Sequence, residues 1–278
     1  HYAGLLSGGV QDYNNWRRTE DGATQNESSY ITEAFTNMAV DWLEVQEKPW
    51  FLWLAYTAPH TPFHAPPANM HQQGALVPYE DGMDPMPYYM AAIEAMDYQI
   101  GELLDAIPRS EWDETTIFFL GDNGTPAEVV QSPYTNNSTK GSVYQGGINT
   151  PFFACGRGVD RIGEDDNLIC STDLFATIAE LSGVNIKQIH NSHSFASLLS
   201  NHGTVREYQY SDLNNGNKDQ YVISNGSYKL LVNTNAGRQF FNLTNDPYET
   251  TPIDNADLTD AERTIKQLLE AKGDSIRQ

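Results

Sequence analysis

Three short, largely apolar segments constrain the fold of this chain more than any other feature of its sequence. The segments with this pattern are residues 50–56, 115–120 and 151–155. Each has the length of one strand, and a continuous apolar run of that length is typical of a strand buried on both faces. Segments with helical spacing of apolar residues alternate with them, at residues 31–45, 89–107 and 172–181. This alternation predicts an α/β domain in which helices flank a mostly parallel sheet.

The sequence pattern changes after about residue 203. Strand-like runs rich in Tyr, Val, Ile and Phe surround Asn225-Gly226, and an Asn-Gly pair between such runs is a strong hairpin signal. A capping box formed by Thr259 and Glu262 predicts the start of a final helix. We therefore expect an α/β domain over residues 1–203, followed by a small antiparallel sheet with a terminal helix over residues 204–278.

The charge of the chain limits its partners. Its 278 residues include 37 acidic and 16 basic side chains, and the formal net charge is −21. Nucleic acid is excluded as a general partner, because binding to phosphates needs clustered Lys and Arg side chains. No segment approaches the ~18 consecutive apolar residues of a membrane span, so we expect no membrane span.

Two histidines follow the first expected strand. In open α/β sheets, ligands bind beyond the carboxyl ends of the strands, so polar residues that leave those ends are candidates for a site. His60 and His64 lie there among prolines that restrict the backbone. Imidazole can bind an anion or protonate a departing oxygen near neutral pH. A histidine that is hydrogen-bonded within an ordered loop fits the same pattern, and both interpretations stay open.

The next two loops carry candidate ligands for a metal and for an anion. Asp122 and Asn123 follow the second expected strand and offer hard oxygen ligands for Ca²⁺ or Mg²⁺, although Asp-Asn-Gly is also a common turn sequence. Lys140 precedes the third expected strand, and between Lys48 and Lys140 the only Lys or Arg is Arg109. An isolated lysine in an acidic chain favours a specific anionic contact over a general basic patch. Such a fixed charge can stabilise the negative charge that develops in a transition state.

Taken together, five blocks of the sequence resemble the type I sulfatases, which are the formylglycine-dependent branch of the alkaline phosphatase superfamily. In order along the chain, these blocks are residues 50–67, 115–124, 140–151, 171–184 and 240–249. The resemblance covers nearly the whole chain and implies an alkaline-phosphatase-like α/β fold. It also implies an arylsulfatase-like enzyme, a sulfuric ester hydrolase that acts on aryl or carbohydrate sulfates with a calcium cofactor.

The same resemblance implies roles for five residues of this sequence. Asp122 and Asn123 would complete a Ca²⁺ shell, with Mg²⁺ as the alternative, together with two acidic ligands from an earlier part of a full-length enzyme. Lys140 would hold the sulfate, and His60 would contact it and protonate the leaving alcohol. His64 lies in the same substrate-binding loop, where we expect a supporting or structural role.

The resemblance also implies an element that is missing from the sequence. A type I sulfatase needs a Cys or Ser within a C/S-x-P-x-R segment, which is converted to formylglycine, and neither Cys155 nor Cys170 fits. Residues 1–6 resemble the family segment that comes after the nucleophile segment in the sequence. We therefore expect an incomplete catalytic domain, with no nucleophile in this chain and no activity of the chain alone. The exposed sheet would be covered by a missing N-terminal segment, by a second chain or by self-association.

Two other functions remain open at this stage. One is a phosphodiester or phosphonate monoester hydrolase of the same superfamily, since related metal shells and anion clamps accept tetrahedral phosphorus. The other is a non-catalytic, sulfatase-like fragment that serves as a binding module. The family resemblance and the acidic composition imply a secreted or periplasmic location.

Overall fold

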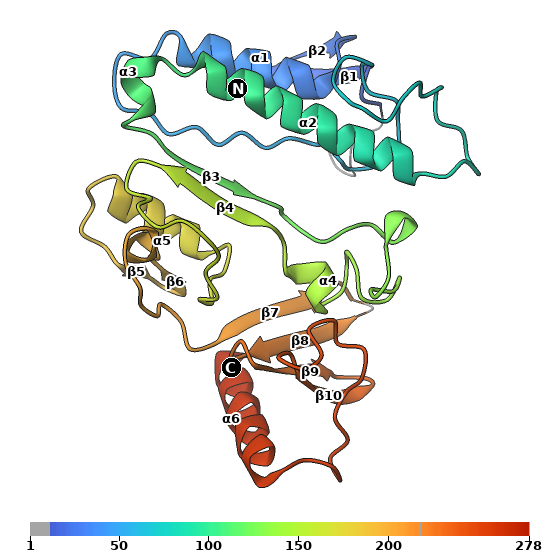
Figure 1. Ribbon diagram of the computed structural model, residues 1–278, viewed down its shortest axis with the longest axis vertical. Helices are drawn as coiled ribbons and strands as arrows, with labels where there is room; N and C mark the ends of the chain where they lie inside the picture. The colour runs from blue at the N-terminus through green and yellow to red at the C-terminus, as the bar shows by residue number, and fades with distance from the viewer. Residues whose placement is uncertain (1–11, 217, 278) are drawn as a thin grey trace. The chain divides into compact units, whose positions relative to one another are not determined.

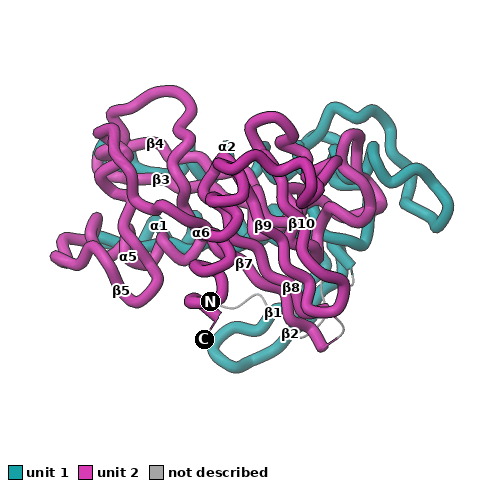
Figure 2. Tube along the Cα trace, turned by 90° about the horizontal axis from the view of Figure 1, so that it is seen from below, with its two compact units in different colours: residues 1–113 teal, residues 114–278 magenta. Residues whose placement is uncertain are grey.

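The chain forms two compact units, residues 1–113 and 114–278 (Figure 2). The structure is a computed structural model that describes residues 12–216 and 218–277, so the sulfatase-like segment at residues 1–6 lies outside the described residues. The predicted division at residue 203 falls inside the second unit and stays a prediction.

Unit 1 combines a hairpin with two packed helices (Figure 1). Its elements are β1 (Trp16–Glu20), β2 (Ala23–Glu27), α1 (Ile31–Leu43), α2 (Met86–Ala106) and α3 (Arg109–Trp112). Asp21 and Gly22 both have positive φ in the β1–β2 turn, as a type I′ hairpin turn requires. The buried residues Ile31 and Phe35 recur at helical spacing on α1 and join the core of this unit, and the predicted helices at 31–45 and 89–107 are thereby confirmed.

Residues 50–56 do not form the strand that their apolar pattern predicts. They pair with no described strand, and only one side of the segment is covered: Leu54 and Tyr56 pack against the core of unit 1. Phe51 and Trp53 alternate with them and are 59% and 65% exposed. The apolar pattern predicts a segment buried on both faces, but the described residues cover only one face of it.

Unit 2 begins with a pair of strands that determines where its loops lie. β3 (Thr116–Leu120) and β4 (Phe152–Gly156) match the second and third expected strands. They pair antiparallel, with Leu120 opposite Phe152, and every strand pair among the described residues is antiparallel. The expected mostly parallel sheet is therefore not confirmed. The end of β3 lies beside the start of β4. The connection formed by residues 121–151 therefore leaves and re-enters the strand pair at the same end.

Short elements fill the rest of the first part of unit 2. They are η1 (Ala127–Val129), α4 (Gln145–Ile148), α5 (Asp173–Leu181), β5 (Gln188–Ile189), β6 (Ser192–His193) and η2 (Ala196–Leu199). The predicted helix at 172–181 is confirmed, and Gly183 ends it with a φ of 85° and an N–H bond to Glu180 O.

The C-terminal part of unit 2 is the predicted antiparallel sheet with its terminal helix. The elements are β7 (Gln209–Asn214), β8 (Asp219–Ser224), β9 (Tyr228–Asn233), β10 (Gly237–Asn242) and α6 (Asp260–Arg277), and the strand order is β10-β9-β8-β7. Asn225-Gly226 forms the β8–β9 turn, and Gly226 has a φ of 88°. Thr259 and Glu262 exchange hydrogen bonds at the start of α6, as the capping box predicts. α6 packs against β8 and β9 (Figure 1). Among the described residues, no helix is both long and apolar enough to cross a membrane.

Candidate functional site

The predicted site residues are distributed over both units. Unit 2 carries Asp122, Asn123 and Lys140, all on the connection between β3 and β4, and unit 1 carries His60 and His64. Asp122 and Lys140 are 18 positions apart in the sequence. The antiparallel pairing of β3 with β4 nevertheless brings their two segments to the same end of the strand pair.

Backbone hydrogen bonds join the Asp122 segment to the Lys140 segment. The bonds are Gly121 N–H to Pro151 O (3.0 Å), Gly124 N–H to Gly147 O (3.0 Å) and Lys140 N–H to Thr125 O (3.0 Å). The Thr150 hydroxyl adds a fourth by donating to Gly121 O at 2.8 Å. Because main-chain atoms make most of these contacts, the position of Lys140 relative to Asp122 is fixed by the backbone itself.

Three glycines permit this close approach. A Cβ atom on Gly124 would lie 1.9 Å from Gly146 O, and one on Gly147 would lie 2.3 Å from Ser142 O. A Cβ atom on Gly146 would lie 2.3 Å from Ser138 O. These are backbone atoms, which cannot rotate away, so a Cβ atom at Gly124 would separate the two segments. A Cβ atom at Gly146 or Gly147 would instead distort the second segment, because the atoms it meets belong to residues 138 and 142. We call residues 121–125 and 138–151 the glycine-locked loops.

Asp122 and Asn123 have the donor chemistry of a calcium site but supply only part of one. Both residues are exposed, and they offer a carboxylate and an amide oxygen, which are the hard ligands that Ca²⁺ prefers. Within the described residues, no group of three or more His, Cys, Asp or Glu side chains could hold a metal ion. A Ca²⁺ ion takes about six to eight oxygen ligands, so these two residues fit the ion as members of a larger shell.

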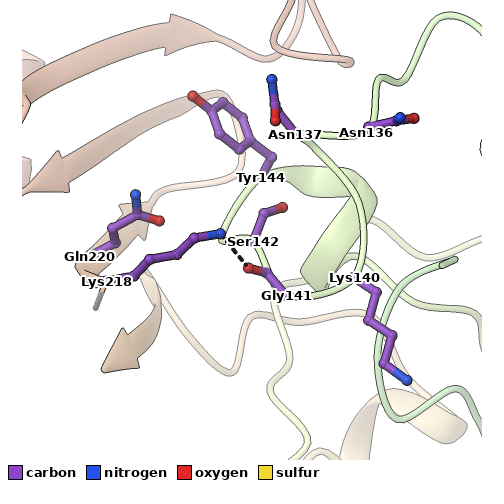
Figure 3. Close-up of a pocket in the computed structure, with 8 residues that line it drawn as sticks. All are labelled: Asn136, Asn137, Lys140, Gly141, Ser142, Tyr144, Lys218 and Gln220. Atoms are coloured by element: carbon purple, nitrogen blue, oxygen red, sulfur yellow. Dashed lines mark hydrogen bonds between the residues drawn. The ribbon is translucent and has the colours of Figure 1, made fainter. Parts of the chain in front are cut away.

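Lys140 lines the edge of a polar cavity, and its side chain extends away from the other lining residues (Figure 3). Its side chain is exposed, and its ammonium group makes no ion pair with any described residue. The cavity of about 270 Å³ is lined by Asn136, Asn137, Lys140, Gly141, Ser142, Tyr144, Lys218 and Gln220 (Figure 3). Figure 3 shows Lys218 reaching toward Gly141, where its Nζ donates to the carbonyl oxygen at 3.4 Å. Two lysines beside one cavity stand out in a chain with a net charge of −21.

In unit 1, buried rings and hydroxyls hold the loop that carries His60. The Tyr13 hydroxyl lies 2.7 Å from His60 O and 3.0 Å from Thr57 O and donates to these carbonyls. The His64 ring stacks on Tyr13 with centroids 3.7 Å apart. The His64 Nδ1–H donates to Pro62 O at 3.2 Å, because a carbonyl can only accept, and Nε2 then accepts from the Tyr30 hydroxyl at 3.1 Å.

The two histidines differ in what remains free on each ring. Both His64 nitrogens are used in hydrogen bonds, one to Pro62 in the loop and one to Tyr30 before α1. These contacts give His64 a structural role, and direct contact with a substrate stays a prediction. His60 is exposed, and its Nδ1–H donates to Thr61 O at 2.7 Å. That bond fixes the ring and leaves Nε2 available for an exchangeable proton.

Burial shifts the titration of this cluster. Desolvation lowers the pKa of His64 to about 4, although its bond to Pro62 and the Asp12 carboxylate oppose the shift. Desolvation also raises the pKa of Tyr30 to about 12. His64 is therefore a neutral ring at pH 7, as its role as an acceptor for Tyr30 requires.

Sequence analysis missed a buried ion pair in the C-terminal part of unit 2. Lys229 Nζ lies 2.6 Å from a carboxylate oxygen of Glu249, and both side chains are almost completely buried. Burial lowers the pKa of Lys229, and the Glu249 carboxylate opposes that shift. One signal was available, because Lys229 interrupts the apolar β9 run, although its partner lies 20 positions away. Glu249 falls within the sulfatase-like block at 240–249, but nothing in the sequence indicated that it is buried.

Comparison with known proteins identifies the family to which the chain belongs. The family model described as Sulfatase matches residues 6–184, which is more than half of the chain. The chain belongs to the sulfatase family, and the predicted family is thereby confirmed.

Individual relatives agree with this assignment. The chain is 26% identical over 194 residues to the uncharacterized sulfatase YdeN of Escherichia coli (strain K12), covering 67% of this chain and 33% of that protein. It is 26% identical over 239 residues to an arylsulfatase of Klebsiella aerogenes, covering 56% of this chain and 51% of that protein. The chain therefore spans between a third and about half of the length of these relatives.

A solved structure shows the same fold at lower identity. The structure of BT4656 in complex with its substrate D-glucosamine-2-N,6-O-disulfate matches with a TM-score of 0.76 and 18% identity, covering 94% of this chain and 73% of that chain. This match supports the predicted sulfatase-type α/β fold.

The close contact at Gly124 predicts a large effect of one methyl group. We expect Gly124→Ala to lower the free energy of unfolding by about 3 kcal/mol, because its Cβ must displace the backbone at Gly146. The matched control is Gly203→Ala, whose Cβ would meet only Leu198 at an ordinary 3.8 Å and should change stability by less than about 1 kcal/mol. Urea unfolding measures both, and equal stability of the two variants would contradict the locked arrangement.

The depressed pKa of His64 predicts a pH-dependent stability. The folded-state pKa of about 4 lies below the usual 6.5, so the unfolded chain binds the proton first as pH falls. Stability is complete above pH 6.5 and decreases as pH falls toward 4, by roughly 3 kcal/mol for the full shift. Urea unfolding at pH 7 and pH 4.5 should show a smaller loss for His64→Gln than for the wild type. The exposed His60→Gln should keep the wild-type loss, and an unchanged loss in His64→Gln would exclude His64 as its source.

Proposed function

We propose that this chain carries the anion-binding part of a sulfatase that hydrolyses sulfate esters. The observation that carries the proposal is the pair of glycine-locked loops, which holds the backbone of the exposed Lys140 beside the Asp122 segment in a member of the sulfatase family. A fixed cation next to hard oxygen ligands suits a small, doubly charged tetrahedral anion with a divalent metal ion.

In the proposed reaction, the residues of this chain bind and orient the ester. Lys140 binds the sulfate oxygens and stabilises the negative charge that builds up on them in the transition state. His60 delivers a proton from Nε2 to the leaving alcohol oxygen, while its Nδ1–H bond to Thr61 O keeps the ring oriented. His64 holds the same loop from within and takes part only through it.

Asp122 and Asn123 are the proposed ligands of Ca²⁺, with Mg²⁺ as the alternative, and further ligands come from outside the described residues. When bound, such an ion neutralises sulfate charge and lowers the pKa of the attacking hydroxyl. The sequence contains no C/S-x-P-x-R segment, so the proposed reaction needs a formylglycine nucleophile that this sequence does not supply. We expect the chain alone to be inactive for this reason.

Exposed aromatic side chains support the proposal that each unit packs against further polypeptide. Phe51 and Trp53 in unit 1 are mostly exposed, and so are Phe153 and Phe175 in unit 2, at 64% each. Rings of this size are usually covered in a complete domain. An additional segment, a second chain or a second copy could cover them.

The substrate class in the proposal is a sulfate ester of an alcohol or a phenol. The similarity to an arylsulfatase favours aryl sulfates, and the fold shared with a protein that binds a sulfated glucosamine favours carbohydrate sulfates. A secreted or periplasmic location belongs to the same proposal and is supported by family membership.

Removal of the Lys140 charge tests the proposal. We expect Lys140→Ala to weaken the binding of inorganic sulfate by about tenfold or more, measured by calorimetric titration of the chain with Ca²⁺ present. Lys187→Ala removes an exposed lysine elsewhere in unit 2 and should leave the affinity unchanged. Equal affinities in the two variants would contradict the role of Lys140. A marked preference of the wild type for phosphate over sulfate would instead favour the phosphoester hydrolase.

A further inference from the structure

The buried ion pair between Lys229 and Glu249 joins two segments of unit 2 that lie 20 positions apart. Lys229 is on β9, Glu249 follows β10, and their side chains are 1% and 0% exposed. Removing two charges from water costs several kcal/mol per ion, so a buried pair by itself is weak evidence for stability. Its contacts with third residues are therefore more informative than the pair alone.

Both members of this pair contact the same residue of the second glycine-locked loop, residues 138–151. A Glu249 carboxylate oxygen accepts the backbone N–H of Gln145, and Lys229 Nζ lies 3.4 Å from the side-chain oxygen of Gln145. Gln145 is the first residue of α4 and directly precedes Gly146 and Gly147, which contact Gly124. The ion pair thus holds the loop at the position where the glycine contact forms.

The two residues before Gln145 also contact the C-terminal sheet. The Tyr144 hydroxyl donates to the Gln239 side-chain oxygen on β10 at 2.7 Å, and its ring meets Phe241 edge-on. Val143 is 1% exposed and packs with Val222 and Leu231 of the C-terminal sheet. Three consecutive residues of the loop are therefore held by the sheet.

Glu249 makes this contact from a backbone conformation that is unfavourable for a residue with a side chain. Its φ of 57° is in the left-handed region, which is uncommon for a residue with a long side chain. An unfavourable conformation of this kind persists where surrounding contacts determine it.

We infer that Lys229 and Glu249 form a positioning unit, which fixes residues 139–149 on the C-terminal sheet and so determines where Lys140 stands. The consequence for sulfate binding rests on the proposed function, but the effect on loop order does not. A pair that served stability alone could be replaced by apolar side chains of similar size with little loss. Such a replacement here leaves the Gln145 N–H without its acceptor.

The test uses trypsin under native conditions, because both Lys140 and Arg157 are exposed and each is followed by glycine. In the double variant Lys229→Met with Glu249→Met, we expect cleavage after Lys140 to accelerate by about tenfold or more, while cleavage after Arg157 keeps its rate. Lys229→Met with Glu249→Gln retains an acceptor for the Gln145 N–H without leaving a buried unpaired charge, and should recover most of the protection. Glu270→Gln breaks the surface pair with Arg238 and serves as the control without effect on either site.

A second pair of variants decides the question if the double variant does not fold. Proline is tolerated at the first position of a helix, so Gln145→Pro removes the N–H that Glu249 accepts while leaving the ion pair in place. We expect faster cleavage after Lys140 in Gln145→Pro than in Gln145→Ala, which keeps that N–H. Equal rates in these two variants, or an unchanged rate in a folded variant with Lys229→Met and Glu249→Met, would overturn the positioning role.

Sulfate titration of the same variants separates this inference from the proposed function. If the loop is loosened and sulfate affinity falls by about tenfold, both are supported. If the wild type does not bind sulfate, the proposed function fails while the cleavage rates still test the positioning unit.

Discussion

The contact between Gly124 and the backbone at Gly146 and Gly147 is the constraint on which the candidate site in unit 2 depends. It brings two peptide segments closer than any side chain would allow, and the antiparallel pairing of β3 with β4 delivers both segments to that point. The residues proposed to bind a metal ion and an anion then stand on hydrogen-bonded main chain, although each lies on an irregular loop. A site built in this way depends on backbone packing more than on the side chains that perform the chemistry.

A similar division between supporting and presenting residues occurs in unit 1. The polar atoms of Tyr13, Tyr30 and His64 bond to one another or to the loop backbone, and burial keeps His64 neutral. His60, in the same loop, is exposed. The strongly acidic composition therefore describes the surface of the protein, whereas the chemistry proposed for the site rests on a few cationic or proton-carrying groups that the fold isolates.

Local sequence signals predicted the four longest helices among the described residues and the β8–β9 turn. The capping box at Thr259, the Asn225-Gly226 turn and the helical spacing on α1 each depend on neighbours within a few residues, and the structure confirms all three. Strand direction could not be predicted in this way, because an apolar run reports burial and carries no information about its partner. Residues 50–56 show the same limit, since the run has the composition of a strand but finds no described strand to pair with.

The candidate site was predictable as a set of residues but not as a geometry. The order of motifs indicated Asp122, Asn123, Lys140 and His60. The reason for glycine at positions 124, 146 and 147 became visible only in the contacts of the folded chain. Lys229 and Glu249 were missed because their pairing joins distant positions and because charged residues are seldom buried.

Amide hydrogen exchange of the wild-type chain tests the central claim most directly. If the glycine-locked loops move as one body with β3 and β4, the Gly124 and Lys140 amides exchange slowly and with the same opening free energy as the amides of the two strands. Rapid exchange at Gly124 and Lys140, while the strand amides remain protected, would show that the loops move independently and would contradict the account.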